Sequence, residues 1–146
     1  IYTSEEFTKE TLIICDAKII VYASSSALDS DFVARLCEVT ADGISTNIQE
    51  GIIRAKYRNS LTNPQPVEPN TVNEYTISLG PVGYLIAKSS KIRVAIAGID
   101  FPQWDRKSQT GEHDFHEHFS EYRAATQIVF HDYDHPSRLE MSITNE

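Results

Sequence analysis

The chain has 146 residues, of which 40% are hydrophobic and 10% aromatic, a composition typical of one globular domain with its own core. Thirteen basic and twenty-one acidic residues give a formal net charge of −8, which disfavours nucleic acid and anionic membrane surfaces as partners. No apolar run in the sequence approaches the roughly 18 residues that a membrane-spanning helix requires.

Alternating apolar and polar residues predict about seven β-strands. The clearest strand begins at Phe32, which shares one face with Ala34 and Leu36, while the residues between them point to the other face. Turn signals such as Asp42-Gly43 and Gly80-Pro81 separate neighbouring strands. The predicted strands are 12–15, 18–23, 32–37, 52–58, 75–79, 92–96 and 139–143.

The remaining segments contain little helical pattern. Only 117–128 has apolar residues at helical spacing, so we expect one short helix there, and the three prolines of 60–73 indicate a surface loop. Short strands without alternating helices are typical of an antiparallel β-sandwich, a jelly roll or a related all-β fold. The sequence therefore predicts an all-β domain with at most one short helix.

The cysteines and the start of the sequence bear on the cellular compartment and on the origin of the chain. Cys15 and Cys37 lie in predicted strands, so we expect reduced, buried thiols that fit the cytoplasm, with a disulfide between strands as the alternative. The sole methionine is Met141 and no signal peptide is recognisable, so we expect a processed chain or part of a longer polypeptide.

The sequence lacks the glycine-flanked serine of a hydrolase nucleophile elbow. The nearest candidate is Ser45, which follows Gly43 but has no second glycine, and it lies after a predicted hairpin turn instead of between a strand and a helix. We therefore expect no catalytic residue in this chain.

A histidine-rich segment is the main candidate for a metal site. His113, His116 and His118 lie within six residues, together with Asp114 and Glu117. Imidazole and carboxylate groups at short spacing can bind Zn²⁺. The spacing is not the i, i+4 helical pair of a metalloprotease, and the surrounding sequence is polar. We therefore favour a solvated loop that holds no metal or other cofactor.

Two carboxylates, Asp29 and Asp31, lie near the start of a predicted strand. Residues two apart on a strand point the same way, as the members of some acid–base pairs do. Such carboxylates more often accept hydrogen bonds from turn N–H groups or pair with arginine across a sheet. Because Arg35, Arg54 and Arg58 lie on predicted strands, we favour this structural role.

The segment after the 92–96 strand combines aromatic and charged residues. We expect Phe101 and Trp104 to plug one end of the sandwich, and Asp105 and Arg106 to tie the loop to the sheet through charge-assisted hydrogen bonds. A sugar-stacking platform and an interdomain contact are the alternatives for Trp104.

Five segments in chain order carry a family resemblance: Ser24–Phe32, Asp42-Gly43, Gly51–Arg58, Phe101–Gly111 and His135-Pro136-Ser137. Over roughly Tyr2 to Ile143, the chain resembles the C-terminal non-catalytic domain of the X-prolyl dipeptidyl-peptidase and cocaine esterase-like (CocE/NonD) serine hydrolases. No single segment is specific for this family, but the occurrence of all five in order and at ordinary spacing is.

The resemblance implies a jelly-roll β-sandwich of the galactose-binding-like type, following an α/β-hydrolase domain. Members of that family cleave peptide, ester or amide bonds with a Ser-Asp-His triad on the other domain, and no triad position maps onto this chain. The implied function of residues 1–146 is a non-catalytic accessory domain. It would pack on the α/β-hydrolase domain of the same polypeptide and help shape its substrate pocket and oligomer. Tyr22 is the residue that we expect to face that pocket.

The chain departs from the family pattern in three places. Lys107 stands where the family usually has Asn, and Ser89-Ser90-Lys91 replaces a Gly-His pair. Strands that usually precede the equivalent of Tyr2 are missing, so an unpaired sheet edge predicts a homodimer or an edge-to-edge contact.

Two other functions stay open from the sequence alone. An independent carbohydrate-binding module occurs often on this fold, and Trp104, Tyr133 and Tyr84 are its aromatic candidates. A small metal-binding protein would use the three clustered histidines.

Overall fold

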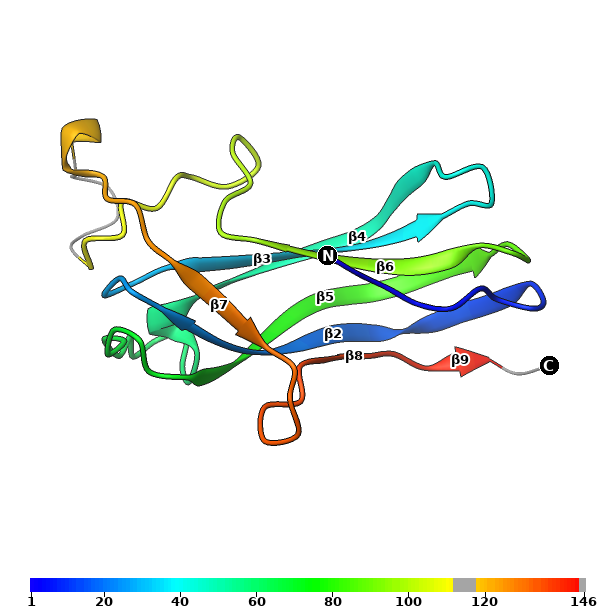
Figure 1. Ribbon diagram of the computed structural model, residues 1–146, viewed down its shortest axis with the longest axis horizontal. Helices are drawn as coiled ribbons and strands as arrows, with labels where there is room; N and C mark the ends of the chain where they lie inside the picture. Colours follow the sequence, from blue (N-terminus) through cyan, green and yellow to red (C-terminus); the bar gives the residue numbers. More distant parts are fainter. Residues whose placement is uncertain (112–117, 145–146) are drawn as a thin grey trace.

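The computed structural model describes residues 1–111 and 118–144, which form two antiparallel β-sheets (Figure 1). The first sheet has the strand order β1-β6-β3-β4; in the second, β5 lies on one side of β2, and β7, β8 and β9 follow one another along its other side. The strands are β1 (Tyr2–Thr3), β2 (Thr11–Ser25), β3 (Asp31–Val39), β4 (Ser45–Arg54), β5 (Asn73–Ile86), β6 (Lys91–Ala97), β7 (Gln127–Phe130), β8 (Arg138–Glu140) and β9 (Ile143–Thr144).

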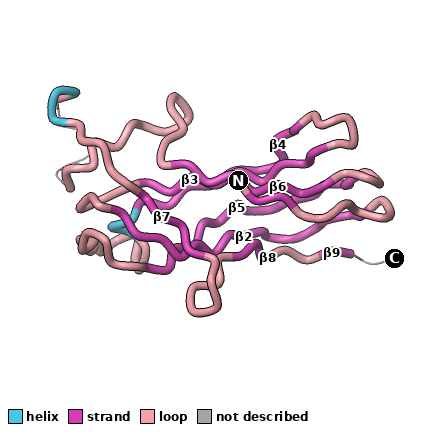
Figure 2. The backbone as a smooth tube through the Cα atoms, viewed as in Figure 1, coloured by secondary structure: helices cyan, strands magenta, loops and turns pink. Residues whose placement is uncertain are grey.

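Strands dominate the described residues, as Figure 2 shows. Within residues 1–111 and 118–144, the helical segments are two single 3₁₀ turns, η1 (Ala55–Tyr57) and η2 (Phe119–Glu121). Among the described residues, no helix has both the length and the apolarity needed to span a bilayer. The expected all-β sandwich is confirmed, and the galactose-binding-like assignment within that class stays a prediction.

The core lies between the two sheets and follows the alternation of the strands. The inward faces predicted for β3 and for the first half of β5 are confirmed, because their alternate side chains are buried in one cluster. Phe32 and Tyr75 join the sheets, with ring centroids 4.6 Å apart. The core residues of the three long strands are Ile13, Ala17, Ile19, Val21, Ala23, Phe32, Ala34, Leu36, Tyr75, Ile77, Leu79, Val82 and Ile86.

A β-bulge on β5 shifts the register between the two long strands of the second sheet, β2 and β5. Ala17 pairs with Gly80 and Lys18 with Ser78, so Leu79 is an extra residue on β5. Gly80 has φ +73°, a left-handed conformation that glycine adopts without strain. Past the bulge, the inward positions of β5 change from odd to even numbers, while those of β2 remain odd.

One side of the sandwich is closed by a close approach of β4 and β5. Gly51 on β4 faces the backbone of β5, and a Cβ atom there would lie only 2.1 Å from the carbonyl oxygen of Ser78. Glycine is therefore required where the edge strands of the two sheets meet.

The sequence placed several strand limits incorrectly. The predicted strands 12–15 and 18–23 are one strand, β2, because the bulge is on its partner and β2 itself continues unbroken. The predicted strand 52–58 ends at Arg54, where η1 begins. That turn forms because the Ala55 N–H donates to the carbonyl of Ser30 and the Lys56 N–H donates to the carboxylate of Asp29.

The helix expected over 117–128 is wrong for the described residues 118–128. One 3₁₀ turn, η2, is followed by extended chain and by β7, which pairs with the end of β2. Ile128 and Val129 are β-branched and favour a strand, and the Thr126 N–H is held by the Ser26 hydroxyl. Sheet pairing therefore overrides the helical spacing.

Candidate functional site

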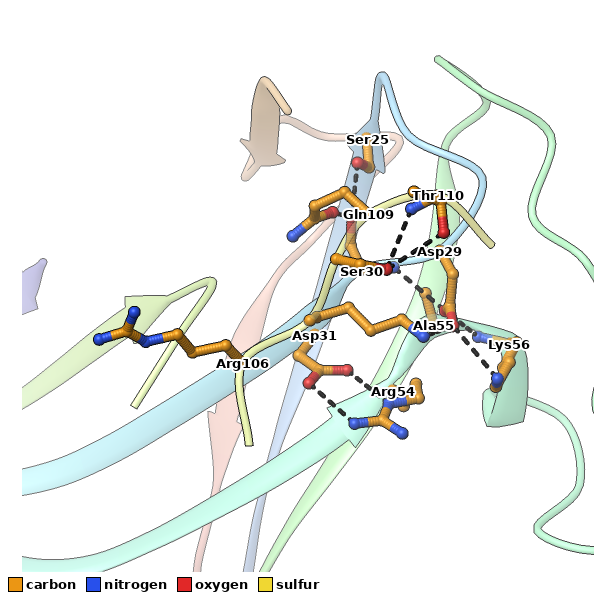
Figure 3. A network of polar contacts seen from close by, with 12 residues as sticks. Ser25, Asp29, Ser30, Asp31, Arg54, Ala55, Lys56, Arg106, Gln109 and Thr110 are labelled. Atoms are coloured by element: carbon orange, nitrogen blue, oxygen red, sulfur yellow. Dashed lines mark hydrogen bonds and ion pairs between the residues drawn. The ribbon is translucent and has the colours of Figure 1, made fainter. Parts of the chain in front are cut away.

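Most residues singled out in the sequence gather at one end of the sandwich, where the turn before β3, η1 and the loop that follows β6 meet (Figure 3). Asp29, Ser30 and Asp31 are all buried there. Buried carboxylates are retained only when their charge and their lone pairs are matched by partners. The partners of these residues therefore decide what this end of the molecule does.

Asp29 is the centre of the buried network. Its Oδ1 accepts hydrogen bonds from the N–H groups of Ser30 and Lys56, both at 3.1 Å. Its Oδ2 lies 2.8 Å from Nζ of Lys107 and 3.6 Å from Nζ of Lys56. The side chains of Lys107 and Asp29 are 2% and 1% exposed, so this ion pair is shielded from water.

Asp31 forms a separate pair across the first sheet. Arg54 is its register partner on β4, and the guanidinium donates to both carboxylate oxygens, at 2.9 and 3.3 Å. Such a two-point contact fixes the geometry as well as the charge. The structure thus brings Asp31 and Arg54 together.

The other two candidate arginines are not joined to this pair of carboxylates. Arg58 donates to the backbone carbonyls of Ala55 and Gln65. Arg35 pairs with Glu50 and Asp100 on the outer face of the first sheet, and the hydrogen bond to Asp100 raises the pKa of Arg35. Arg35, Arg54 and Arg58 therefore form contacts in three different parts of this domain.

Serine hydroxyls complete the network. Ser25 Oγ lies 2.7 Å from Ser30 Oγ, which donates to Oε1 of Gln109 at 2.6 Å. Ser25 also accepts the N–H of Ala27. Each hydroxyl is committed to a structural contact, so neither is available as a nucleophile.

The loop after β6 differs from its expected arrangement. Phe101 is 55% exposed and lies under the guanidinium of Arg106, 4.5 Å from the ring centroid, and Trp104 is half-buried. Neither aromatic residue belongs to the core cluster, and Asp105 is exposed. Lys107 is the residue of this loop that inserts into the sandwich, because Asp29 needs a buried cation.

Tyr22 lies on β2, away from its core face. Its hydroxyl donates to Glu74 on the neighbouring strand, and its ring meets His135 edge-to-face with centroids 5.8 Å apart. The hydrogen bond to Glu74, helped by partial burial and by the negative charge of Glu74, raises the pKa of Tyr22. Tyr22 is therefore a neutral hydrogen-bond donor at neutral pH.

A buried carboxylate that sequence reasoning missed lies near the other end of β3. Glu38 accepts hydrogen bonds from the Tyr84 hydroxyl at 2.8 Å and from the Ala87 N–H at 2.9 Å. Burial alone would raise the pKa of Glu38, but these bonds and one from Ser90 outweigh it and lower the pKa. Glu38 alternates with Leu36 on the inward face of its strand, which is the only signal that predicts its burial.

Metal binding gains no support from the described residues. They contain no group of three or more His, Cys, Asp or Glu side chains placed to hold an ion. His118 is exposed at the start of η2, and His113 and His116 lie outside the described residues. Within residues 1–111 and 118–144, the acidic groups at the loop end are explained by internal pairing.

The family description that matches residues 1–140 is the X-Pro dipeptidyl-peptidase C-terminal non-catalytic domain. The chain belongs to this family. It is 30% identical over 142 residues to a cocaine esterase from Rhodococcus sp. (strain MB1 Bresler). The aligned region covers 97% of this chain and 25% of that protein. The resemblance drawn from the five sequence segments is confirmed.

Solved structures agree with this assignment. An aminopeptidase from a marine sediment Thaumarchaeota archaeon superposes with a TM-score of 0.93 at 25% identity, over 99% of this chain and 25% of that one. An α-amino acid ester hydrolase superposes with a TM-score of 0.92 at 24% identity, over 98% of this chain and 25% of that one, and shows the fold alone. The chain thus spans about a quarter of the length of these relatives.

Proposed function

We propose that residues 1–146 act as one accessory domain of a serine hydrolase that cleaves peptide, ester or amide bonds. In this proposal the domain packs on an α/β-hydrolase domain of the same polypeptide and helps to shape its substrate pocket. The observation that carries the proposal is the match of residues 1–140 to a domain family described as non-catalytic. The commitment of the buried serines and carboxylates to internal contacts supports it further.

The proposed contribution to the substrate pocket comes from Tyr22. Its aromatic ring is half-buried on β2, and Glu74 and His135 hold it in place. A rigid aromatic residue of this kind can form a wall of a pocket between domains. We also propose a cytoplasmic location, which the free thiols of Cys15 and Cys37 support.

The two alternatives gain less support. A carbohydrate-binding face needs aromatic rings free to stack on sugar, but Tyr84 packs against the core and donates to Glu38. The metal-binding alternative depends on His113 and His116, which lie outside the described residues. The homodimer expected from an open sheet edge stays a prediction.

The test compares this chain with the full-length hydrolase that contains it, using an activated ester and an X-Pro arylamide as substrates. We expect no turnover by the 146-residue chain and turnover by the full-length protein. Enzyme-like hydrolysis by the purified chain would overturn the proposal.

Within the full-length protein, Tyr22→Ala should change the ratio of kcat/KM values for two substrates of different size, by about tenfold, while the unfolding temperature of the hydrolase domain is kept. Tyr133→Ala is the matched control, because Tyr133 is 96% exposed. An unchanged ratio in Tyr22→Ala would remove Tyr22 from the pocket.

A further inference from the structure

The turn between β3 and β4 contains Asp42-Gly43, the one Asp-Gly pair of the sequence. Because glycine has no side chain to hinder the approach, its backbone nitrogen can attack the carboxyl carbon of a preceding aspartate. A bond forms between that nitrogen and Cγ, a Cγ–O bond breaks, and the oxygen leaves as water with the amide proton, which closes a succinimide ring. Water then adds to either carbonyl of the ring and gives aspartate or isoaspartate, whose main chain runs through Cβ and is one atom longer.

The Asp42-Gly43 pair lies open to solvent at the tip of the β3–β4 hairpin. Gly43 has φ +89°, and within the described part of the chain no atom lies within 4 Å of the place that a Cβ atom would take there. The reactivity of the pair therefore depends on the hydrogen bonds of the turn itself.

The nitrogen of Gly43 is held by the backbone of this turn. Its N–H donates to the carbonyl of Thr40 at 2.8 Å, and the Thr40 N–H donates to the carbonyl of Ile44 at 2.9 Å. This pattern is typical of a three-residue hairpin loop with glycine in the left-handed conformation. Attack on Asp42 requires the nitrogen to lose its proton and to turn toward Cγ, so the turn must first open.

The carboxylate of Asp42 is held by the side chain of Thr40. The Thr40 hydroxyl donates to Oδ1 of Asp42 and also lies 3.2 Å from the carbonyl oxygen of Ile44. The hydrogen bond from Thr40, helped by the N–H groups of Ile44 and Asp42, lowers the pKa of Asp42. A carboxylate must gain a proton before its oxygen can leave as water, so an ionised Asp42 reacts slowly.

We propose that Asp42-Gly43 is a site of isoaspartate formation and that the Thr40 hydroxyl sets its rate by holding the Asp42 carboxylate. Thr40 is a positioning residue, because none of its own bonds forms or breaks. The longer main chain of the product would displace the Gly43 N–H from the Thr40 carbonyl and loosen the end of the hairpin. This proposal concerns the covalent ageing of the domain and does not rest on the proposed function.

The test measures isoaspartate at position 42 in the full-length protein that contains this chain. The protein is incubated under native conditions and digested, and the aspartate and isoaspartate forms of the peptide are separated and counted. A synthetic peptide of residues 38–47, which has no sheet to hold its turn, gives the rate without these hydrogen bonds. We expect isoaspartate to accumulate at least about tenfold more slowly in the protein than in the peptide, because the turn must open before the ring closes.

Thr40→Val removes the hydroxyl and keeps the β-branched shape of the side chain. In the folded protein this variant should form isoaspartate about tenfold faster than the wild type, in line with the loss of one hydrogen bond. The same change in the peptide should leave the rate unchanged. Thr40→Ser keeps a hydroxyl and is the matched control, for which we expect the wild-type rate.

Three results would overturn the proposal. Isoaspartate absent from both the protein and the peptide would remove the site, and equal rates in the two would show that the turn does not protect it. A Thr40→Val protein as slow as the wild type, or a Thr40→Ser protein as fast as Thr40→Val, would remove the role of the hydroxyl.

Discussion

Lys107 and Asp29 illustrate how one buried charge dictates the path of a distant loop. Asp29 lies in the turn before β3, and its Oδ1 holds the backbone of both that turn and η1. Burying its second oxygen without a cation would be strongly unfavourable. Lys107 supplies the cation and thereby anchors the loop that carries Phe101 and Arg106 on its exposed side.

Removing the cation should therefore destabilise the domain. We expect Lys107→Met to lower the free energy of unfolding by about 3 kcal/mol, near the lower end for a broken buried pair because Lys56 remains beside Asp29. The double variant Lys107→Met/Asp29→Asn should recover most of the loss, since the amide oxygen can still accept the two backbone N–H groups. Urea denaturation measures both changes.

The control for this cycle is the exposed pair of Lys18 with Glu140, at 2.9 Å. Lys18→Met should change the free energy of unfolding by less than about 1 kcal/mol, because exposed ion pairs contribute little. A loss in Lys107→Met no larger than in Lys18→Met would show that the buried pair does not anchor the loop.

At the scale of elements, Gly51 sets how closely the two sheets approach at the closed side. Gly51→Ala should lower the free energy of unfolding by about 3 kcal/mol or more, because the new Cβ would clash with the backbone of Ser78. Gly83→Ala is the matched control: nothing lies within 4 Å of the position that its new methyl group would take, and we expect a change of less than about 1 kcal/mol. Similar thermal denaturation curves for the two variants would contradict the close approach.

Sequence reasoning could predict the strands whose own residue pattern indicates a strand, without knowledge of the strands that lie beside them. The sequences of β3 and of the first half of β5 alternate, so the residues that they place in the core follow from the period of a strand. The later half of β5 could not be predicted in this way, because the bulge at Leu79 changes which positions face inward. β1 has two residues and β7 four, too short for any period to be detected, and both exist only because a longer strand lies beside them.

In the candidate site, too, some residues could be predicted from the local sequence pattern and others depend on tertiary contacts. The sequence predicts that Asp31 pairs with an arginine across the sheet, but it leaves Arg35, Arg54 and Arg58 as candidates. The register of β3 with β4 in the structure selects Arg54. Lys107 could be noticed only as an unusual residue, since nothing local indicates that a lysine in a polar surface loop is buried. Its partner is specified by the tertiary fold.

At the scale of the whole molecule, the two ends of the sandwich bury acidic groups in different ways. At the loop end, Asp29 is matched by lysines, whereas at the far end of β3 the neutral donors Tyr84, Ser90 and the Ala87 N–H surround Glu38. Because the pKa of Glu38 is lower in the folded than in the unfolded state, its carboxylate stabilises the fold above its ordinary pKa. That contribution is lost as the pH falls through the lowered pKa.

Glu38→Gln should therefore lower the free energy of unfolding by about 2 kcal/mol at neutral pH, since an amide offers one acceptor in place of two charged ones. The difference from the wild type should shrink on acidification, when the wild-type carboxylate becomes protonated. Urea denaturation at several pH values measures this, with Glu68→Gln in an exposed loop as the control. A difference that does not depend on pH would contradict the assigned role of Glu38.

The extra residue at Leu79 has a consequence for how this domain can vary. Its deletion would leave Ser78 opposite Lys18 and Gly80 opposite Ala17, so the ladder would become regular, Val82 and Ile86 would stay inward, and the buried side chain of Leu79 would be lost. Loss of a single codon elsewhere in β5 would instead invert a whole face of the strand, whereas additions within the surface turn 60–72 leave both sheets in register. Length variation among related domains should consequently concentrate in such turns and spare the rest of β5.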